Sequence, residues 1–251
     1  AYPNPFNPST TLHFDLPQAA LHGSFAALAG ELASRGQGAE GQDGEGFRLN
    51  VANALWLQED FDLLRDYLAL VEAAYGATPR PVDFQGAPEE ARVTINDWVA
   101  DETEDRITDL IPAGVIDTLT RLVLTNAIYF NAAWALPFDD DLTREGPFTL
   151  LDGKEIAVPM MRQTGGYRYL NAEGYQAVEL FYEGDELSMV IVLPDGGQFE
   201  SFEGSLDAAR LAEIEAGLSY QQVALSLPRF EFESQFSLSE ALAALGMADA
   251  F

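Results

Sequence analysis

The fold of this chain is decided by one stretch, Leu122-Val123-Leu124-Thr125-Asn126-Ala127-Ile128-Tyr129-Phe130. The stretch is rich in β-branched, aromatic and other apolar side chains and carries no charged residue. A nearly continuous apolar run of this length predicts a β-strand that is covered on both faces, which places it in the middle of a sheet. Asn126 interrupts the run, and a buried amide needs hydrogen-bond partners.

Helical and extended patterns alternate on the N-terminal side of this strand. Apolar residues recur at helical spacing over 19–35, over 63–75 and from Pro88 onward, where a proline in the first helical turn is well tolerated. Residues 47–57 and 79–84 read as extended segments between these helices.

On the C-terminal side the helix signals fade and strand signals dominate. The patterns predict a hairpin made of strands 176–182 and 187–193, then a strand over 222–232 and a short helix over 239–245. No repeat and no linker between two cores is visible. This order of elements indicates a single α+β domain.

The charge balance excludes whole classes of partner. The 251 residues include 41 acidic and 13 basic side chains, which gives a formal net charge of −28. Such a field repels nucleic acids and anionic membranes. No apolar run approaches the length of a membrane span, about 18 residues or more. We therefore expect neither nucleic acid nor a membrane as a partner.

The sequence offers little material for a catalytic or metal site. It contains no cysteine and only two histidines, His13 and His22, which we interpret as structural residues. The glycines at 36, 38 and 41 match a dinucleotide fingerprint only as a bare pattern, because they follow a helix and precede a strand. We expect no cofactor and no metal. Carboxylate-based hydrolysis stays open as an alternative, because 41 acidic residues form many pairs, and so does a binding module without chemistry.

Four blocks of sequence, in the right order, resemble the serpin family of serine protease inhibitors, in its bacterial form. The blocks are Leu49–Trp56; Ile95–Val99 with Thr103, Ile107 and Leu110–Ile111; Leu122–Phe130 with Trp134 and Pro137–Phe138; and Leu187–Pro194 with Leu227–Phe251. The resemblance implies an α+β serpin-like fold, incomplete in this chain, with a large mixed sheet A, smaller sheets B and C, and surrounding helices.

The resemblance also implies a mechanism and residues that take part in it. Serpins are suicide inhibitors of serine or cysteine proteases, whose cleaved reactive loop inserts into sheet A as a new strand. The strand that borders the insertion is similar to Leu122–Phe130, with Leu122, Leu124, Asn126, Ile128 and Phe130 along it. Asn126 matches the shutter, the region where the sheet opens. Two interpretations of Asn126 are equally compatible with the sequence: a contact that switches between two arrangements, and a plain hydrogen bond to a neighbouring strand. Trp134 matches the breach, where insertion begins, and Asn96 and Trp98 belong to helix F.

The chain also departs from the serpin pattern. The resemblance implies an interior fragment in which the first helices and the reactive loop are missing, so the chain alone is expected to be inactive. Residues 1–11 read as an extended proline-rich lead of foreign origin, and 12–251 as one partial serpin domain. Without the strand that normally lies beside it, Leu122–Phe130 would form an apolar edge open to self-association.

The resemblance leaves one further alternative and several partner expectations. A non-inhibitory serpin acting as a carrier or chaperone is the alternative within the fold. Serpins often bind heparin through a basic helix D, but the matching helix over 19–35 offers only Arg35, so we expect no heparin cofactor. The family favours an extracellular or periplasmic location.

Overall fold

A computed structural model describes residues 18–41, 44 and 46–230 of the chain, and the structural statements below refer to these residues. The expectations for the lead over 1–11, for His13 and for the helix over 239–245 lie outside the described residues.

The first sheet is built around β1 (Arg48–Gln58), which lies between β2 (Pro79–Val82) and β3 (Leu122–Asn131). β2 runs parallel to β1 and β3 runs antiparallel to it, so the sheet is mixed. Its register places Asn53 opposite Asn126. The predicted strands over 47–57 and 122–130 are confirmed, with β1 and not β3 in the centre.

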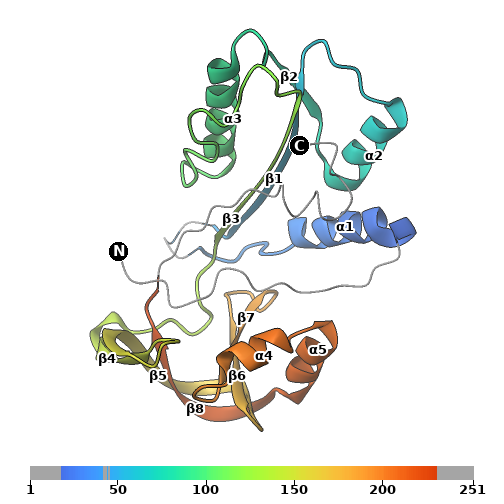
Figure 1. Cartoon of the computed structure of the whole chain (residues 1–251). Helices are drawn as coiled ribbons and strands as arrows, with labels where there is room; N and C mark the ends of the chain where they lie inside the picture. The colour runs from blue at the N-terminus through green and yellow to red at the C-terminus, as the bar shows by residue number, and fades with distance from the viewer. Residues whose placement is uncertain (1–17, 42–43, 45, 231–251) are drawn as a thin grey trace.

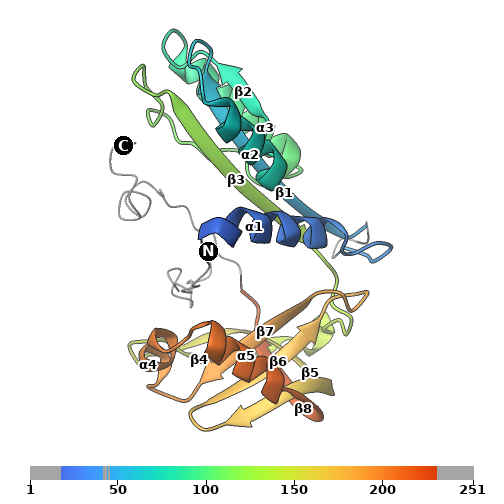
Figure 2. The same ribbon diagram turned by 90° about the vertical axis from the view of Figure 1, so that its right-hand side faces the viewer.

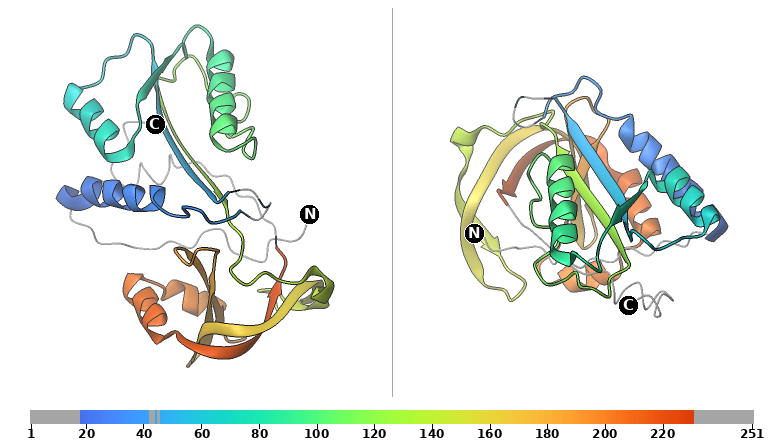
Figure 3. Two further views of the ribbon diagram at one scale, coloured as in Figure 1. Left: turned by 180° about the vertical axis from the view of Figure 1, so that it is seen from behind. Right: turned by 90° about the horizontal axis from the view of Figure 1, so that it is seen from above.

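Helices lie on both faces of β1, whose successive side chains point to opposite sides. Leu55 packs with α2 (Arg65–Tyr75) on one face, whereas Ala54 and Trp56 pack with α3 (Pro88–Glu102) on the other. Figure 1 and the view from behind in Figure 3 show the two helices on either side of the strands.

The first helix, α1 (Gln18–Ala33), lies against α2. The His22 imidazole Nδ1 is 2.8 Å from the Tyr75 hydroxyl, and the two rings meet edge to face. His22 is therefore a hydrogen-bonded structural residue, as expected.

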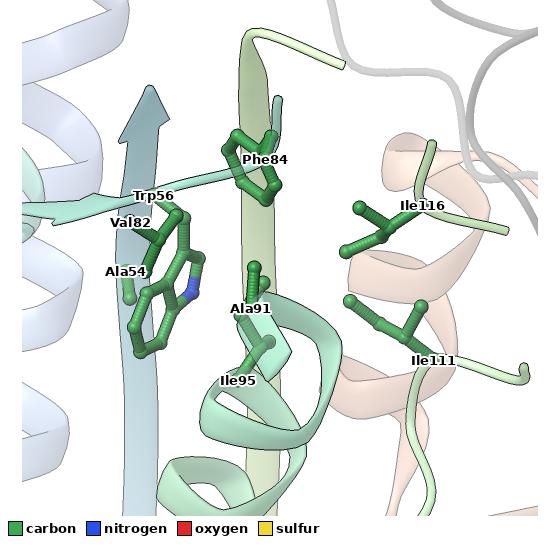
Figure 4. Packing of buried hydrophobic residues seen from close by; sticks show 8 residues of the cluster. All are labelled: Ala54, Trp56, Val82, Phe84, Ala91, Ile95, Ile111 and Ile116. Carbon is green, nitrogen blue, oxygen red and sulfur yellow. The ribbon is translucent and has the colours of Figure 1, made fainter. Parts of the chain in front are cut away.

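The largest core cluster fills the space between β1 and α3 (Figure 4). Phe84 and Ile95 are fully buried at its centre, packed with Trp56 of β1. Ile111 and Ile116, from the segment that follows α3, close the cluster on the side of β3 that lies away from β1 in Figure 4.

The second sheet is antiparallel throughout and has five strands. Its strands are β4 (Arg144–Thr149), β5 (Glu155–Ala172), β6 (Tyr175–Phe181), β7 (Ser188–Pro194) and β8 (Ser219–Pro228). The short helix η1 (Asp140–Leu142) precedes it, and α4 (Phe199–Gly204) and α5 (Ala208–Gly217) pack on one of its faces, visible in Figure 2.

The α+β class and the hairpin of β6 and β7 are confirmed. The expectation that helices fade after the third strand is wrong, because α4 and α5 lie between β7 and β8. The two smaller sheets expected here are one continuous sheet, since the long β5 pairs with β4 at one end and with β6 at the other.

Candidate functional site

The candidate site is the edge of β3 that faces away from β1. No strand pairs with this edge among the described residues. Thr125, Ala127 and Tyr129 share one face and are buried. The other face carries the five positions that the resemblance assigns to the border of an inserted strand, all exposed: Leu122, Leu124, Asn126, Ile128 and Phe130.

This alternation corrects the expectation of a central strand covered on both faces. β3 is at the edge of its sheet, and Leu124 and Ile128 are each 56% exposed. The apolar composition of the run did not distinguish a strand with two covered faces from a strand with one open apolar face. Self-association through this edge, which the resemblance led us to expect, stays a prediction.

The backbone of the same five residues faces the free edge. The Gln58 N–H donates to the Arg121 carbonyl oxygen over 3.0 Å, in the register that also places Leu57 opposite Leu122. Residues that bond across an antiparallel pair alternate with residues that do not. The N–H and C=O groups of the even-numbered positions from Leu122 to Phe130 therefore point away from β1 and stand ready to pair with another strand.

Asn126 is held by the neighbouring strand. Its side-chain Nδ2 donates to Oδ1 of Asn53 over 2.8 Å, and the two residues are directly opposite in the register. Asn126 is exposed, which corrects the expectation of a buried amide. Sequence reasoning did not identify Asn53 as the partner of Asn126. A usable signal existed, because Asn53 lies in a strand that was expected in the same sheet as Asn126.

Asn96, on α3, holds the segment that returns from the helix to β3. Its Oδ1 accepts the Ile111 N–H over 2.9 Å, and its Nδ2 donates to the Ile111 carbonyl oxygen over 3.0 Å. Arg92 donates to the same carbonyl oxygen over 2.8 Å. The segment 103–121, which we call the strap, is thus fixed to α3 through Ile111, and Ile107 and other apolar residues of the strap pack against the buried face of the sheet.

Trp98, on the same helix, belongs to an aromatic contact and not to the edge itself. Its ring meets Trp56 edge to face with centroids 5.5 Å apart. The Arg80 guanidinium lies 4.8 Å from the Trp98 centroid. Of the two α3 residues that the resemblance implied, Asn96 therefore fixes the strap and Trp98 packs α3 on β1.

Trp134 lies just beyond β3, where the chain passes to the second sheet. Its ring stacks on Tyr182 with centroids 4.5 Å apart, and the two residues form an isolated β-bridge. The Phe130 ring also meets Tyr182, at 4.9 Å and edge to face. The end of β3 is in this way joined to the hairpin of β6 and β7. Tyr182 was not predicted as part of the site.

Two tyrosines near the C-terminal end of β3 have displaced pKa values. A hydrogen bond from the Arg48 guanidinium lowers the pKa of Tyr129 below its ordinary value. Burial raises the pKa of Tyr182. Both tyrosines belong to the packing around β3.

The described residues hold no group of three or more histidine, aspartate or glutamate side chains that could bind a metal ion. A shallow depression of about 430 Å³ lies beside α4, lined by Glu173, Asp195, Ser201 and Phe202 among others. It is far along the chain from the edge of β3, and nothing in its lining resembles a catalytic constellation.

Comparisons with known proteins agree with the geometry. A sequence model described as "Serpin (serine protease inhibitor)" matches residues 7–251. A serpin-like protein of Thermococcus kodakarensis is 42% identical over 83% of this chain and 48% of its own length. Antithrombin-III of Mus musculus is 42% identical over 80% of this chain and 43% of its own length.

A further relative, the leukocyte elastase inhibitor of Homo sapiens, is 36% identical over 97% of this chain and 64% of its own length. The solved structure of ovalbumin from emu, Dromaius novaehollandiae, superposes with a TM-score of 0.81 at 29% identity, covering 92% of this chain and 59% of ovalbumin. The chain thus spans between 43% and 64% of the length of these proteins.

Proposed function

The chain belongs to the serpin family, and from that premise we propose that the protein it represents inhibits serine proteases as a suicide substrate. The family model describes an inhibitor and not an enzyme, so the carboxylate hydrolase alternative is disfavoured. The relatives include a protein named as an inhibitor of leukocyte elastase.

One observation carries the proposal: β3 presents a free edge with its backbone groups unpaired among the described residues. In the proposed mechanism a protease cleaves an exposed reactive loop, and the loop then enters sheet A beside Leu122–Phe130. The new strand would satisfy the outward N–H and C=O groups, which have no strand partner among the described residues. The strain of the uncleaved state would supply the driving force.

Asn126 and Trp134 have distinct proposed roles in this step. Asn126 would be the shutter contact, because its amide bond to Asn53 ties together the two strands beside the insertion. Trp134 would mark the breach, because it packs where β3 meets the second sheet. Asn96 would control how firmly the strap lies over the same region.

The test is the formation of a covalent complex that survives denaturation. The full natural gene product is identified by its intact mass and mixed with chymotrypsin-like and elastase-like proteases. We expect a complex that persists on a denaturing gel and is absent when the protease serine is chemically blocked. The 251-residue chain alone is expected to form none. Complete cleavage without any stable complex would contradict the proposal.

Two matched variants test whether the loop inserts at the edge of β3. In the full product, Ile128→Asp places a charge beside the incoming strand, so more of the inhibitor should be cleaved before a complex forms. Val93→Asp introduces the same negative charge at an exposed apolar position on α3. This variant should leave the stoichiometry of inhibition unchanged. Equal stoichiometry for both variants would mean that insertion does not occur beside β3.

The net charge of −28 bears on the protease partner. We propose a preference for basic over acidic proteases, because charge complementarity accelerates encounter. An extracellular or periplasmic location fits a protease partner. No helix in the described part of the chain has the length and apolar character needed to cross a membrane.

We also predict that heparin does not bind. α1, the counterpart of helix D, carries no basic residue in its last turn, and the nearby Arg35 is paired with Glu31 over 2.7 Å. On a heparin column at physiological salt the chain should elute in the flow-through. A charge-gain control with Ser24, Ala27 and Glu31 replaced by arginine should be retained; retention of the unchanged chain would contradict the prediction.

A further inference from the structure

We infer that Asp195 is a site of spontaneous covalent modification, at which an isoaspartyl residue forms. In this modification the peptide bond to Gly196 moves from the α-carboxyl group of the aspartate to its side-chain carboxyl group. The site lies in the turn over 195–198, which joins β7 to α4. The inference needs neither a protease nor a reactive loop, so it stands apart from the proposed inhibition.

The sequence contains three Asp-Gly pairs, which begin at Asp43, Asp152 and Asp195. Glycine has no Cβ, so its backbone nitrogen is the least shielded nitrogen that can follow an aspartate. Asp43 lies outside the described residues. The structure therefore compares two pairs of identical residues, one at Asp152 in the turn between β4 and β5 and the other at Asp195.

The reaction needs no reagent other than water. The Gly196 backbone nitrogen attacks Cγ of Asp195, so that a C–N bond forms and the carboxyl hydroxyl leaves with the amide proton as one water molecule. The product is a five-membered succinimide ring. Water then adds to one of the two ring carbonyl carbons and breaks its bond to nitrogen. Opening at the γ-carbon restores aspartate, whereas opening at the α-carbon leaves the chain joined through the side chain as isoaspartate.

Both reacting groups of the Asp195 pair have no other partner in the described part of the chain. Asp195 is exposed, and its carboxylate makes no hydrogen bond or ion pair with another described residue. The Gly196 N–H likewise donates to no group among these residues. No described atom beyond the neighbouring residues lies within 4 Å of the point where a Cβ on Gly196 would sit. The carboxyl group can therefore approach the nitrogen without first breaking a contact.

The Asp152 pair has the same chemistry, but its two reacting groups are occupied. The Asp152 Oδ1 accepts the Lys154 N–H over 2.9 Å. The Gly153 N–H donates to the Leu150 carbonyl oxygen, also over 2.9 Å. Attack of this nitrogen on the Asp152 carboxyl group would have to break both hydrogen bonds, which costs free energy. We therefore expect Asp152 to react more slowly than Asp195 in the folded chain.

The modification at Asp195 changes a main chain that holds the turn together. The Asp195 N–H donates to the Gly174 carbonyl oxygen over 2.8 Å, and the Asp195 carbonyl oxygen accepts the Gln198 N–H over 2.9 Å. Isoaspartate adds one carbon atom to the backbone between the Asp195 Cα and the Gly196 nitrogen, so these two bonds cannot both keep their geometry. Because α4 begins at Phe199, its N-terminal end should lose its fixed attachment to β7.

Ageing of the purified 251-residue chain tests the inference. The chain is kept at neutral pH below its unfolding temperature and is then digested. Each Asp-Gly peptide is analysed by electron-transfer fragmentation, which distinguishes isoaspartate from aspartate at equal mass. Isoaspartate at Asp195 should exceed that at Asp152 several-fold, and a form that lacks one water, the succinimide, should precede it. Amide hydrogen exchange in the aged chain should be faster at Gln198 and unchanged in β1.

Two substitutions and an unfolded sample serve as controls. Gly196→Ala shields the nitrogen with a methyl group that meets open space, so modification at Asp195 should slow several-fold in an unchanged fold. Asp195→Glu keeps the charge but would need a six-membered ring, so it should stay unmodified. In denaturant Asp152 loses its two hydrogen bonds, and both sites should react at similar rates. The inference is overturned if both sites react alike in the folded chain, or if the excess at Asp195 persists undiminished after unfolding.

Discussion

Replacement of Phe84 by alanine is expected to lower the free energy of unfolding by about 3–5 kcal/mol, the range found when a buried aromatic side chain is truncated. Phe84 is fully buried at the centre of the cluster that joins β1 to α3. Its neighbours Trp56 and Ile95 come from different elements, so they cannot close the cavity together without shifting a strand or a helix.

Chemical denaturation followed by fluorescence and circular dichroism measures this effect. Leu119→Ala is the matched control, because Leu119 is largely exposed on the strap and its loss should change the free energy by no more than about 0.5 kcal/mol. A loss below about 1 kcal/mol for Phe84→Ala would mean that the cluster is not packed as described.

Replacement of Arg168 by alanine is expected to cost about 3 kcal/mol, the lower end of the range for breaking a buried ion pair. The Arg168 guanidinium donates to Glu179, whose side chain is 10% exposed against 31% for the arginine. Arg168 also donates to the Glu215 carbonyl oxygen at the end of α5 over 3.2 Å. Its loss would leave the Glu179 carboxylate in the sheet with the Ser188 hydroxyl as its one remaining hydrogen-bond donor among the described residues.

The double variant Arg168→Ala with Glu179→Gln separates charge burial from packing, because it removes the uncompensated carboxylate. It should recover part of the lost free energy. Arg35→Ala, which breaks the exposed pair with Glu31, is the matched control and should cost less than about 1 kcal/mol. If the double variant is no more stable than Arg168→Ala, the unpaired charge is not the cause of the loss.

The two variants together test the prediction of one domain over 12–251. Phe84 lies under the first sheet and Arg168 lies in the second. In a single cooperative domain each variant shifts the same transition, whichever probe reports it. Two separate transitions, each moved by only one variant, would indicate that the sheets unfold independently.

Periodicity predicted the elements with strong, regular patterns and failed for elements whose patterns are short. α3 and the hairpin of β6 and β7 were predicted from the apolar stripe and from the polar turn between two apolar runs. α4 spans only Phe199–Gly204, too short for a helical period to show. α5 was missed although Asp207, its N-cap, accepts the Arg210 N–H over 2.7 Å, the kind of signal that marks a helix start.

The site residues were predicted from the resemblance to the serpin family and not from reactive side chains. The edge residues of β3 carry no reactive group, so no motif search could have found them, and their importance lies in where the backbone points. The exposure of Asn126 was also beyond the sequence, because an apolar run does not reveal that its strand lies at the edge of a sheet. Asn53, Tyr182 and the strap contact of Ile111 depend on residues distant in the chain.

The pairing of β1 with β3 also determines when the first sheet can form during synthesis of the chain. β1 pairs with β3 across roughly 70 intervening residues, a separation that slows folding because the chain must first close a long loop. At a synthesis rate of about 5–20 residues per second, β1 leaves the ribosome several seconds before β3 exists. During that interval its apolar residues are available to chaperones and to neighbouring nascent chains, so the yield of folded protein should depend on how fast the ribosome reaches Asn131.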